Sequence, residues 1–223
     1  MTAATQNLNL SQKLSNLMGT MHFIKFINNP LKTETIFEMT DSFQKASPPE
    51  MVEKIIQPLL KNSTLASDYQ NKIWYSHPDM KTLSQYPEGS FGKCVAEFFD
   101  KNNLDENLFP KANYSSLIDY ITSRVYQTHD FWHVLTGYSI ELEDELALQA
   151  FAIGQYQQPI NLTIIAGGII HILQHHPERT HKIMTSITEG YQRGLNAEFL
   201  LDKNIFAYLD KPINEVREHF KIQ

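Results

Sequence analysis

The sequence predicts an all-α protein, a bundle of about nine helices in one domain that spans residues 1–223. Three observations support this fold class. Apolar residues recur mainly three and four positions apart, which is the spacing along one face of a helix. No segment between turn signals alternates apolar and polar residues as a strand would. The chain is long enough for one sizeable domain, and it has no internal repeat and no low-complexity linker.

Three helices are predicted in the first third of the chain, with prolines between them. They cover about residues 8–27, 33–45 and 50–61. Pro30 ends the first helix, Pro48-Pro49 marks the start of the third, and Pro58 would kink or shorten that helix. The apolar side chains of the first helix form one stripe: Leu10, Leu14, Leu17, Met18, Met21 and Ile24.

The rest of the chain predicts two loops and six helices. Prolines and glycines mark residues 76–92 as a long ordered loop, and residues 102–113 as a second loop. The helix between these loops is capped by Ser90. The last five helices cover about residues 115–135, 140–157, 161–175, 178–193 and 214–220. Gly137 breaks the first of these, and Pro212 stands in the first turn of the last.

The composition excludes several classes of function. The net charge is −6 and the basic residues are scattered, so nucleic acid is not expected as a partner. The single Cys94 excludes an intrachain disulfide and a thiolate-rich zinc site.

The longest apolar run, residues 160–173, is interrupted by polar residues and therefore predicts a buried helix, not a membrane span. With no leader pattern in residues 1–10, the sequence predicts a cytoplasmic protein without a membrane span.

One predicted helix carries a candidate metal site. His129 and His133 are four residues apart, so their imidazoles lie on one face and can bind one divalent ion. Asp130 can border the same site. Glu145, twelve residues after His133, is a candidate fourth ligand. Two nitrogens and two carboxylate oxygens would complete a coordination set.

The break at Gly137 makes Glu145 a feasible ligand. In a continuous helix, twelve residues at about 3.6 per turn would rotate Glu145 roughly 120° away from the imidazoles. A break lets the next helix fold back toward them. Glu141, Glu143 and Asp144 are rival carboxylates, and the alternative is that the whole acidic run is a solvated helix face.

Three other site assignments fit less well. Zinc peptidases share the His-x-x-x-His spacing but need Glu after the first His, whereas Asp130 is one methylene shorter and suits ligation better. Phosphohydrolases with a His…His-Asp…Asp ligand set need an upstream histidine, and no spacing supports His22 or His77 in that role. A second histidine group consists of His171, His175, His176 and His181. It fits imidazoles at a helix C-terminus better than a metal site.

The segment His129-Asp130-x-x-His133, followed by Glu145, resembles the metal-binding signature of the coenzyme Q (ubiquinone) biosynthesis protein family, Coq-four type. The resemblance implies that these four residues bind a divalent metal. Zinc is the ion most expected, and the donor set also permits iron, manganese or magnesium.

Three further segments are similar to the same family. They are the loop Tyr86-Pro-Glu-Gly-Ser-Phe-Gly92, the approach Arg124-Val-Tyr-Gln-Thr-His129 and the closing segment Pro212-Ile-Asn-Glu-Val-Arg217. Phe206 departs from the pattern, because Trp is expected there. The resemblance therefore extends over nearly the whole chain.

The resemblance implies a role in ubiquinone assembly, with the membrane surface and other quinone-biosynthesis enzymes as partners. Two functions are compatible with it. One is a metal-dependent enzyme that removes the ring C1 carboxylate of a polyprenyl benzoate, with hydroxylation there. The other is a non-catalytic scaffold that binds an isoprenoid lipid. The nonpolar helices also predict a homodimer.

Three more residues are candidates for binding the lipid, and no catalytic residue is assigned. Gly167 and Gly168 lie midway along an apolar helix and would let a prenyl tail lie against the backbone. Their alternative role is close helix packing or a dimer interface. Arg124, five residues before His129, could bind a substrate carboxylate, and its alternative role is a structural salt bridge.

Overall fold

Helices and loops make up all of residues 8–107 and 111–222, the part of the chain that the computed structural model describes. The described residues form no strand, and one isolated bridge joins Ser90 to Pro212. The all-α prediction is therefore confirmed. The long helices are α1 (Leu10–Asn28), α2 (Thr33–Ala46), α3 (Pro49–Leu60), α6 (Phe91–Asn102), α7 (Leu117–Thr136), α8 (Leu142–Tyr156), α9 (Pro159–His175) and α10 (Thr180–Asn196). The short ones are α4 (Ser63–Gln70), α5 (Met80–Leu83) and α11 (Ile213–His219).

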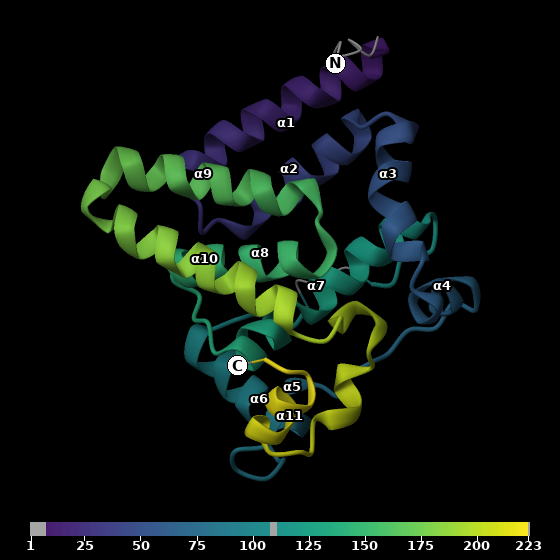
Figure 1. Cartoon of the computed structure of the whole chain (residues 1–223), viewed down its shortest axis with the longest axis vertical. Helices are drawn as coiled ribbons and strands as arrows, with labels where there is room; N and C mark the ends of the chain where they lie inside the picture. Colours follow the sequence, from purple (N-terminus) through teal and green to yellow (C-terminus); the bar gives the residue numbers. More distant parts are fainter. Residues whose placement is uncertain (1–7, 108–110, 223) are drawn as a thin grey trace.

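Helix α8 packs against both α9 and α10, and the three helices form one group in the molecule (Figure 1). Helix α1 packs against α9 and α2 at the edge of this group. At the other end of the molecule, α5, α6 and α11 gather near the C-terminus (Figure 1). Helix α7 runs between the two groups and contacts α6, α8 and α11. It therefore stands where the two parts of the bundle meet.

Two clusters of buried apolar side chains hold the helices together. The larger cluster surrounds α6 and α7 and includes Trp132 and Phe151. The smaller one joins α1, α8 and α9 and includes Leu146 and Ile164. Because α8 contributes Phe151 to one cluster and Leu146 to the other, it is fixed from both sides. Full burial of a side chain of this size stabilises the fold by about 1.5–3 kcal/mol.

The apolar stripe predicted for the first helix faces solvent, which the sequence did not indicate. Every residue of the stripe is at least 41 % exposed, and Leu10 is 84 % exposed. The buried face of α1 carries Gly19, His22 and Phe26 instead. A Cβ at Gly19 would lie 2.7 Å from the ring of Phe43, so the glycine lets α2 approach closely. Periodicity identified the helix but not the face that packs.

Two helices lie where none was predicted. Helix α4 follows Asn62, whose side chain accepts a hydrogen bond from the amide of Leu65. Helix α5 interrupts the predicted loop 76–92 and is capped in the same way by Asp79. Both are short and depend on a side-chain cap, because a short helix lacks the hydrogen bonds to stabilise itself.

Most of the predicted helix ends are close to the observed ones. Ser90 caps α6 by accepting a hydrogen bond from the amide of Lys93. Pro58 does not end α3, which continues to Leu60. Pro212 is the N-cap of α11 and not part of its first turn. Residues 1–7, on which most of the leader argument rests, and residues 108–110 of the predicted second loop lie outside the described residues. No described helix is both long and apolar enough to cross a membrane.

Candidate metal centre

Helix α7 brings the two predicted histidines together. The ring centroids of His129 and His133 are 4.8 Å apart. Asp130 completes a group whose three ligand atoms lie within 4.8 Å of one another. In the described part of the chain, no other group of three or more His, Cys, Asp or Glu residues meets this criterion. The side chain of His133 is 2 % exposed and that of His129 is 27 % exposed, so the site is open on one side.

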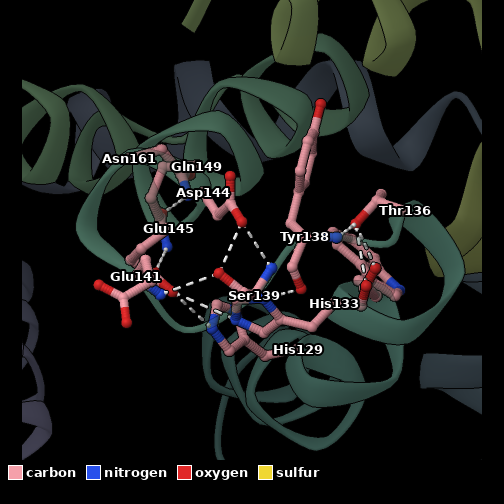
Figure 2. Close-up of polar contacts among 11 residues, drawn as sticks. His129, His133, Thr136, Tyr138, Ser139, Glu141, Asp144, Glu145, Gln149 and Asn161 are labelled. Atoms are coloured by element: carbon pink, nitrogen blue, oxygen red, sulfur yellow. Dashed lines mark hydrogen bonds and ion pairs between the residues drawn. The ribbon is translucent and has the colours of Figure 1, made fainter. Parts of the chain in front are cut away.

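Glu145 reaches the same site from the first turn of α8 (Figure 2). Its Oε2 is 3.2 Å from Nε2 of His133 and 3.6 Å from Nε2 of His129. Gly137 ends α7 with a φ of +78°, and α8 begins at Leu142. This φ lies in the left-handed region that favours glycine. The turn sends the chain back, so that a residue twelve positions further on faces the imidazoles.

Glu143 and Asp144, two of the three rival carboxylates, have other partners. Glu141 is the N-cap residue of α8. Glu143 is buried and forms an ion pair with Arg179. Asp144 accepts hydrogen bonds from the amide and hydroxyl groups of Ser139, at 2.9 and 2.6 Å. Of the four acidic residues, the structure places Glu145 beside the imidazoles.

Two arginines bind the carbonyl end of α7. Arg217 donates from Nε to the Leu135 carbonyl at 2.9 Å and from Nη2 to the Val134 carbonyl at 3.0 Å. Arg193 donates to the Thr136 carbonyl at 2.9 Å. Carbonyls in the last turn of a helix lack partners within the helix and form its negative end. The two cations therefore stabilise the point where α7 stops, and with it the approach of the carboxylate to the imidazoles.

The ligand candidates have hydrogen-bond partners that leave suitable atoms free for a metal. Nδ1 of His133 lies 3.2 Å from the carbonyl of Tyr138, so an N–H there leaves the Nε2 lone pair available. Nε2 of Gln149 donates to Oε1 of Glu145 at 2.7 Å, which leaves Oε2 facing the imidazoles. Ligand atoms about 2.0–2.1 Å from a tetrahedral ion are roughly 3.3 Å apart. The Oε2–Nε2 separations of 3.2 and 3.6 Å are close to this value, so the spacing of Glu145 from the two imidazoles suits a shared divalent ion.

The charges in the site depend on one another. Burial lowers the pKa of His129, but the Glu145 carboxylate outweighs burial and raises this pKa to about 9. Burial would raise the pKa of Glu145, yet the neighbouring imidazoles of His129 and His133 hold it well below its usual range. For Asp130, burial is the largest influence and raises the pKa. In the absence of an ion, a protonated His129 therefore faces an ionised Glu145 at neutral pH.

The candidate ligands line one wall of a mostly apolar cavity of about 280 Å³ between α2, α7, α8 and α9. Ile36, Val125 and Leu148 belong to its apolar walls. A second cavity of about 500 Å³ lies next to it. The two cavities share the lining residues Thr40, Thr122, Gln158 and Ile160. An apolar space with a few convergent polar groups at one wall is typical of a small-molecule site.

Comparison with protein families identifies the family to which the chain belongs. The family model described as coenzyme Q (ubiquinone) biosynthesis protein Coq4 matches residues 6–223. The chain belongs to the Coq4 family. Its family acts in ubiquinone biosynthesis, so the resemblance seen in the sequence is confirmed.

Three relatives show how far the similarity extends. A mitochondrial ubiquinone biosynthesis protein coq4 of Botryotinia fuckeliana is 26 % identical over 74 % of this chain and 61 % of its own length. The coq-4 protein of Caenorhabditis elegans is 26 % identical over 65 % of this chain and 62 % of its own length. The COQ4 homolog of Nematostella vectensis is 23 % identical over 87 % of this chain and 94 % of its own length. The chain thus matches only about three fifths of the first two relatives.

A solved structure shares the fold. A crystal structure from Nostoc punctiforme, described as a candidate ubiquinone biosynthesis protein, superposes with a TM-score of 0.80 at 22 % identity. The match covers 93 % of this chain and 98 % of the other. At 22 % identity, this likeness shows that the two chains share a fold and nothing more.

The predicted cytoplasmic location is wrong. The relatives from Botryotinia, Caenorhabditis and Nematostella are all named as mitochondrial proteins. The prediction rested on residues 1–10, and residues 1–7 lie outside the described part of the chain.

Arg124 lies away from the cavity. Its side chain is buried, and Nη2 donates to the carbonyls of Leu201 and Lys203 at 3.3 and 3.2 Å. The guanidinium also stacks 4.9 Å from the ring centre of Tyr75. Arg124 therefore joins α7 to the C-terminal segment and does not line the cavity.

Gly167 and Gly168 mark close helix contacts. A Cβ at Gly167 would lie 2.6 Å from the ring of Phe26, and one at Gly168 would lie 2.7 Å from Leu146. Neither glycine lines either cavity. Both positions therefore have the packing role that was their alternative assignment.

Four further histidines lie outside the candidate metal centre. Nδ1 of His22 is 3.2 Å from the hydroxyl of Ser42. His77 packs against the rings of Phe131 and Phe206. The pair His171 and His175, with ring centres 4.7 Å apart, gains no third ligand within the described residues.

The structure adds residues that the sequence reasoning missed. Gln149 lies four positions after Glu145, so its place on the same helix face was available as a signal. Asn161 donates to Gln149 from another helix, and no local pattern indicates this contact. Arg193 and Arg217 also reach the end of α7 from distant segments.

Proposed function

We propose that this Coq4 family member binds a divalent metal ion and, beside it, a prenylated aromatic carboxylate. The metal ligands are His129, Asp130, His133 and Glu145. The observation that carries the proposal is the Glu145 carboxylate between two imidazoles in the wall of an apolar cavity. Zinc is the expected ion, and iron, manganese or magnesium also suit a set of two nitrogens and two oxygens.

The protein and the ion have separate tasks in this proposal. A bound divalent ion would supply Lewis-acid stabilisation of negative charge on a ligand oxygen. The apolar walls, such as Ile36 and Leu148, would surround the ring and exclude water. Gln149 and the Tyr138 carbonyl would keep Glu145 and His133 in one orientation. The protein thus orients the ligand and sets the polarity around it.

The reaction that we propose is replacement of the ring C1 carboxylate by a hydroxyl group. The ring carbon loses carbon dioxide and gains oxygen, which removes two electrons from the ring. With dioxygen and water as co-reactants the balance closes, because dioxygen is reduced to hydrogen peroxide. Zinc does not change its oxidation state. With zinc, the electrons must therefore pass from the ring to dioxygen directly, whereas iron or manganese could take part in the transfer.

Metal analysis and a product assay test this function together. The metal content of the purified protein is measured first. Release of carbon dioxide and formation of the hydroxylated ring are then followed with 3-farnesyl-4-hydroxybenzoate in the presence of dioxygen. His133→Ala should lose both metal and product. His175→Ala, in the other pair of histidines four residues apart, is the matched control and should keep both. A folded His133→Ala variant with full product formation would overturn the catalytic proposal.

A non-catalytic role is the second candidate. Four protein ligands leave a tetrahedral ion without an open position, and closed sites of this kind are typical of structural zinc. In that case the protein would bind metal and prenylated ligand without forming product. The same assay separates the two roles, because ligand binding with no turnover supports the scaffold.

Three contacts with other molecules belong to this proposal. They are contacts with other quinone-biosynthesis enzymes, with a membrane surface and with a second copy of the chain. The exposed apolar residues of α1 are the first surface to test, because at least 41 % of each is accessible. Substitution of Leu14 and Leu17 by Ser should then weaken co-purification with such partners.

A further inference from the structure

The side-chain amides of Gln149 and Asn161 form a hydrogen-bonded chain that starts at Glu145 and runs along the wall of the cavity (Figure 2). Nε2 of Gln149 donates to Oε1 of Glu145 at 2.7 Å, and Nδ2 of Asn161 donates to Oε1 of Gln149 at 2.6 Å. The direction of both hydrogen bonds is forced, because a carboxylate only accepts. Gln149 must turn its NH₂ group to Glu145 and its oxygen to Asn161. Oδ1 of Asn161 is therefore left as a free acceptor.

This acceptor is buried without a partner, and a buried donor lies in the same turn of the chain. Oδ1 of Asn161 and Nε2 of Gln158 have no hydrogen-bond partner. The residues are 4 % and 6 % exposed, and both line the cavity of the metal centre. A buried polar atom without a partner costs about 1–3 kcal/mol. Two such atoms, one acceptor and one donor, therefore indicate a group that the cavity is built to receive.

The surroundings of these two atoms are also polar. Tyr156 lines the same cavity. Burial raises the pKa of its hydroxyl group, and the nearby Asn161 amide lowers it in part. The phenol therefore stays protonated at neutral pH. The wall at the start of α9 thus combines a hydroxyl group with two amides, whereas the cavity elsewhere is mostly apolar.

We propose that Asn161 and Gln158 form a second polar subsite, which binds a ring hydroxyl group of the ligand. A hydroxyl group both donates and accepts hydrogen bonds. It would donate to Oδ1 of Asn161 and accept from Nε2 of Gln158. This inference rests on the proposed function, in which the metal centre binds the ring carboxylate. In a 4-hydroxybenzoate the two groups lie at opposite ends of the ring, in keeping with a hydroxyl subsite two amide groups away from Glu145.

The subsite also determines where a prenyl chain would go. Gln158 and Ile160 line both cavities, so the hydroxyl subsite lies at the junction between them. A chain on the ring carbon next to the hydroxyl group would enter the second cavity, whose walls include Phe43, Met51 and Ile55.

Two probes that differ in one oxygen test the subsite. The zinc-loaded full chain is titrated by calorimetry with 3-farnesyl-4-hydroxybenzoate and with 3-farnesylbenzoate, which lacks the hydroxyl group. We expect the hydroxylated probe to bind about three- to tenfold more tightly, the usual effect of one or two hydrogen bonds. In Gln158→Leu the two dissociation constants should become nearly equal. Asn161→Leu should do the same and also weaken zinc binding, because Asn161 holds Gln149.

Thr40→Val is the matched control. Thr40 lines both cavities, but its hydroxyl group already donates to the Ile36 carbonyl at 2.8 Å, so the preference for the hydroxylated probe should persist. Gln158→Leu is the decisive variant, since Nε2 of Gln158 has no hydrogen-bond partner whose loss could disturb the amides that hold Glu145. If both probes bind the wild type equally and only with zinc present, the subsite is overturned and the proposed function stands. If neither probe binds, the proposed function fails and the subsite fails with it.

Discussion

Oε2 of Glu145 lies 3.2 Å from Nε2 of His133, although a helix break separates the two residues in the chain. The contact exists because Gly137 adopts a φ of +78° and turns the chain back after one helix ends. The carboxylate and the imidazoles attract one another, so the pKa of His129 rises to about 9 while that of Glu145 falls. A local backbone conformation thus brings a carboxylate beside two imidazoles.

Replacement of Gln149 by Leu should weaken metal binding about 10- to 100-fold, the usual effect of losing a hydrogen bond to a metal ligand. Gln149 holds Oε1 of Glu145 at 2.7 Å and so directs Oε2 toward the imidazoles. Competition with a chromophoric chelator measures the affinity. Gln174→Leu, on the exposed side of α9, is the control and should bind metal like the wild type. An unchanged affinity in Gln149→Leu would show that the amide does not position the carboxylate.

Gly137→Ala should lower both stability and metal affinity. An L-residue in the left-handed region costs about 1–2 kcal/mol, and a Cβ here would meet only Arg217, at an ordinary distance of 3.5 Å. Relief of the strain would move the start of α8 and with it Glu145. Gly89→Ala is the control, because Gly89 has a φ of +74° and its Cβ would meet nothing within 4 Å. Thermal unfolding should show similar losses in both variants, and only Gly137→Ala should lose metal affinity.

Metal binding should release a proton and strengthen as the pH rises. The pKa of His129 is raised to about 9, so most molecules without metal carry this proton at pH 7. A metal must displace it, and the apparent affinity should rise about tenfold per pH unit below pH 9. Calorimetry in buffers of different ionisation enthalpy counts the protons released. A count of zero at pH 7 would contradict this assignment of charge.

The protein without metal should lose stability as the pH rises from about 6.5 to about 9. The folded pKa of His129 lies above its usual value of 6.5, so its pairing with Glu145 stabilises the fold fully below pH 6.5. That contribution disappears when His129 loses its proton near pH 9. Chemical unfolding across this range measures the effect, and Glu145→Gln should remove most of the pH dependence. A Glu145→Gln variant with the wild-type pH profile would show that another group is responsible.

The sequence predicted those parts of the site that depend on local geometry. The spacing of His129 and His133 fixes their common face, and Gly137 indicates a helix end by its conformational preference. Both follow from residues close together in the chain. The break made Glu145 a feasible ligand, but it left Glu141, Glu143 and Asp144 as rivals.

The parts that the sequence did not predict depend on packing between distant segments. The apolar stripe of α1 lies on one face of the helix, but that face is exposed to solvent. The helix packs through Gly19, His22 and Phe26, because α2 and α9 fit against these residues. The contact of Asn161 with Gln149 requires α9 to lie beside α8. Neither relationship leaves a periodic pattern in one segment.

Gly190→Ala should destabilise the fold and displace α8, the helix that carries Glu145. A Cβ at Gly190 would lie 2.1 Å from the carbonyl oxygen of Ala147, and the backbone of α8 cannot move aside as a flexible side chain would. Overpacking of this kind costs about 1–3 kcal/mol or more. Because the obstruction pushes on α8 within one turn of Glu145, metal affinity should fall together with the midpoint of thermal unfolding. Glu189→Ala, at the adjacent exposed position of α10, should change neither quantity. Loss of stability with full metal affinity in Gly190→Ala would mean that α8 keeps its position through its contacts with α7 and α9.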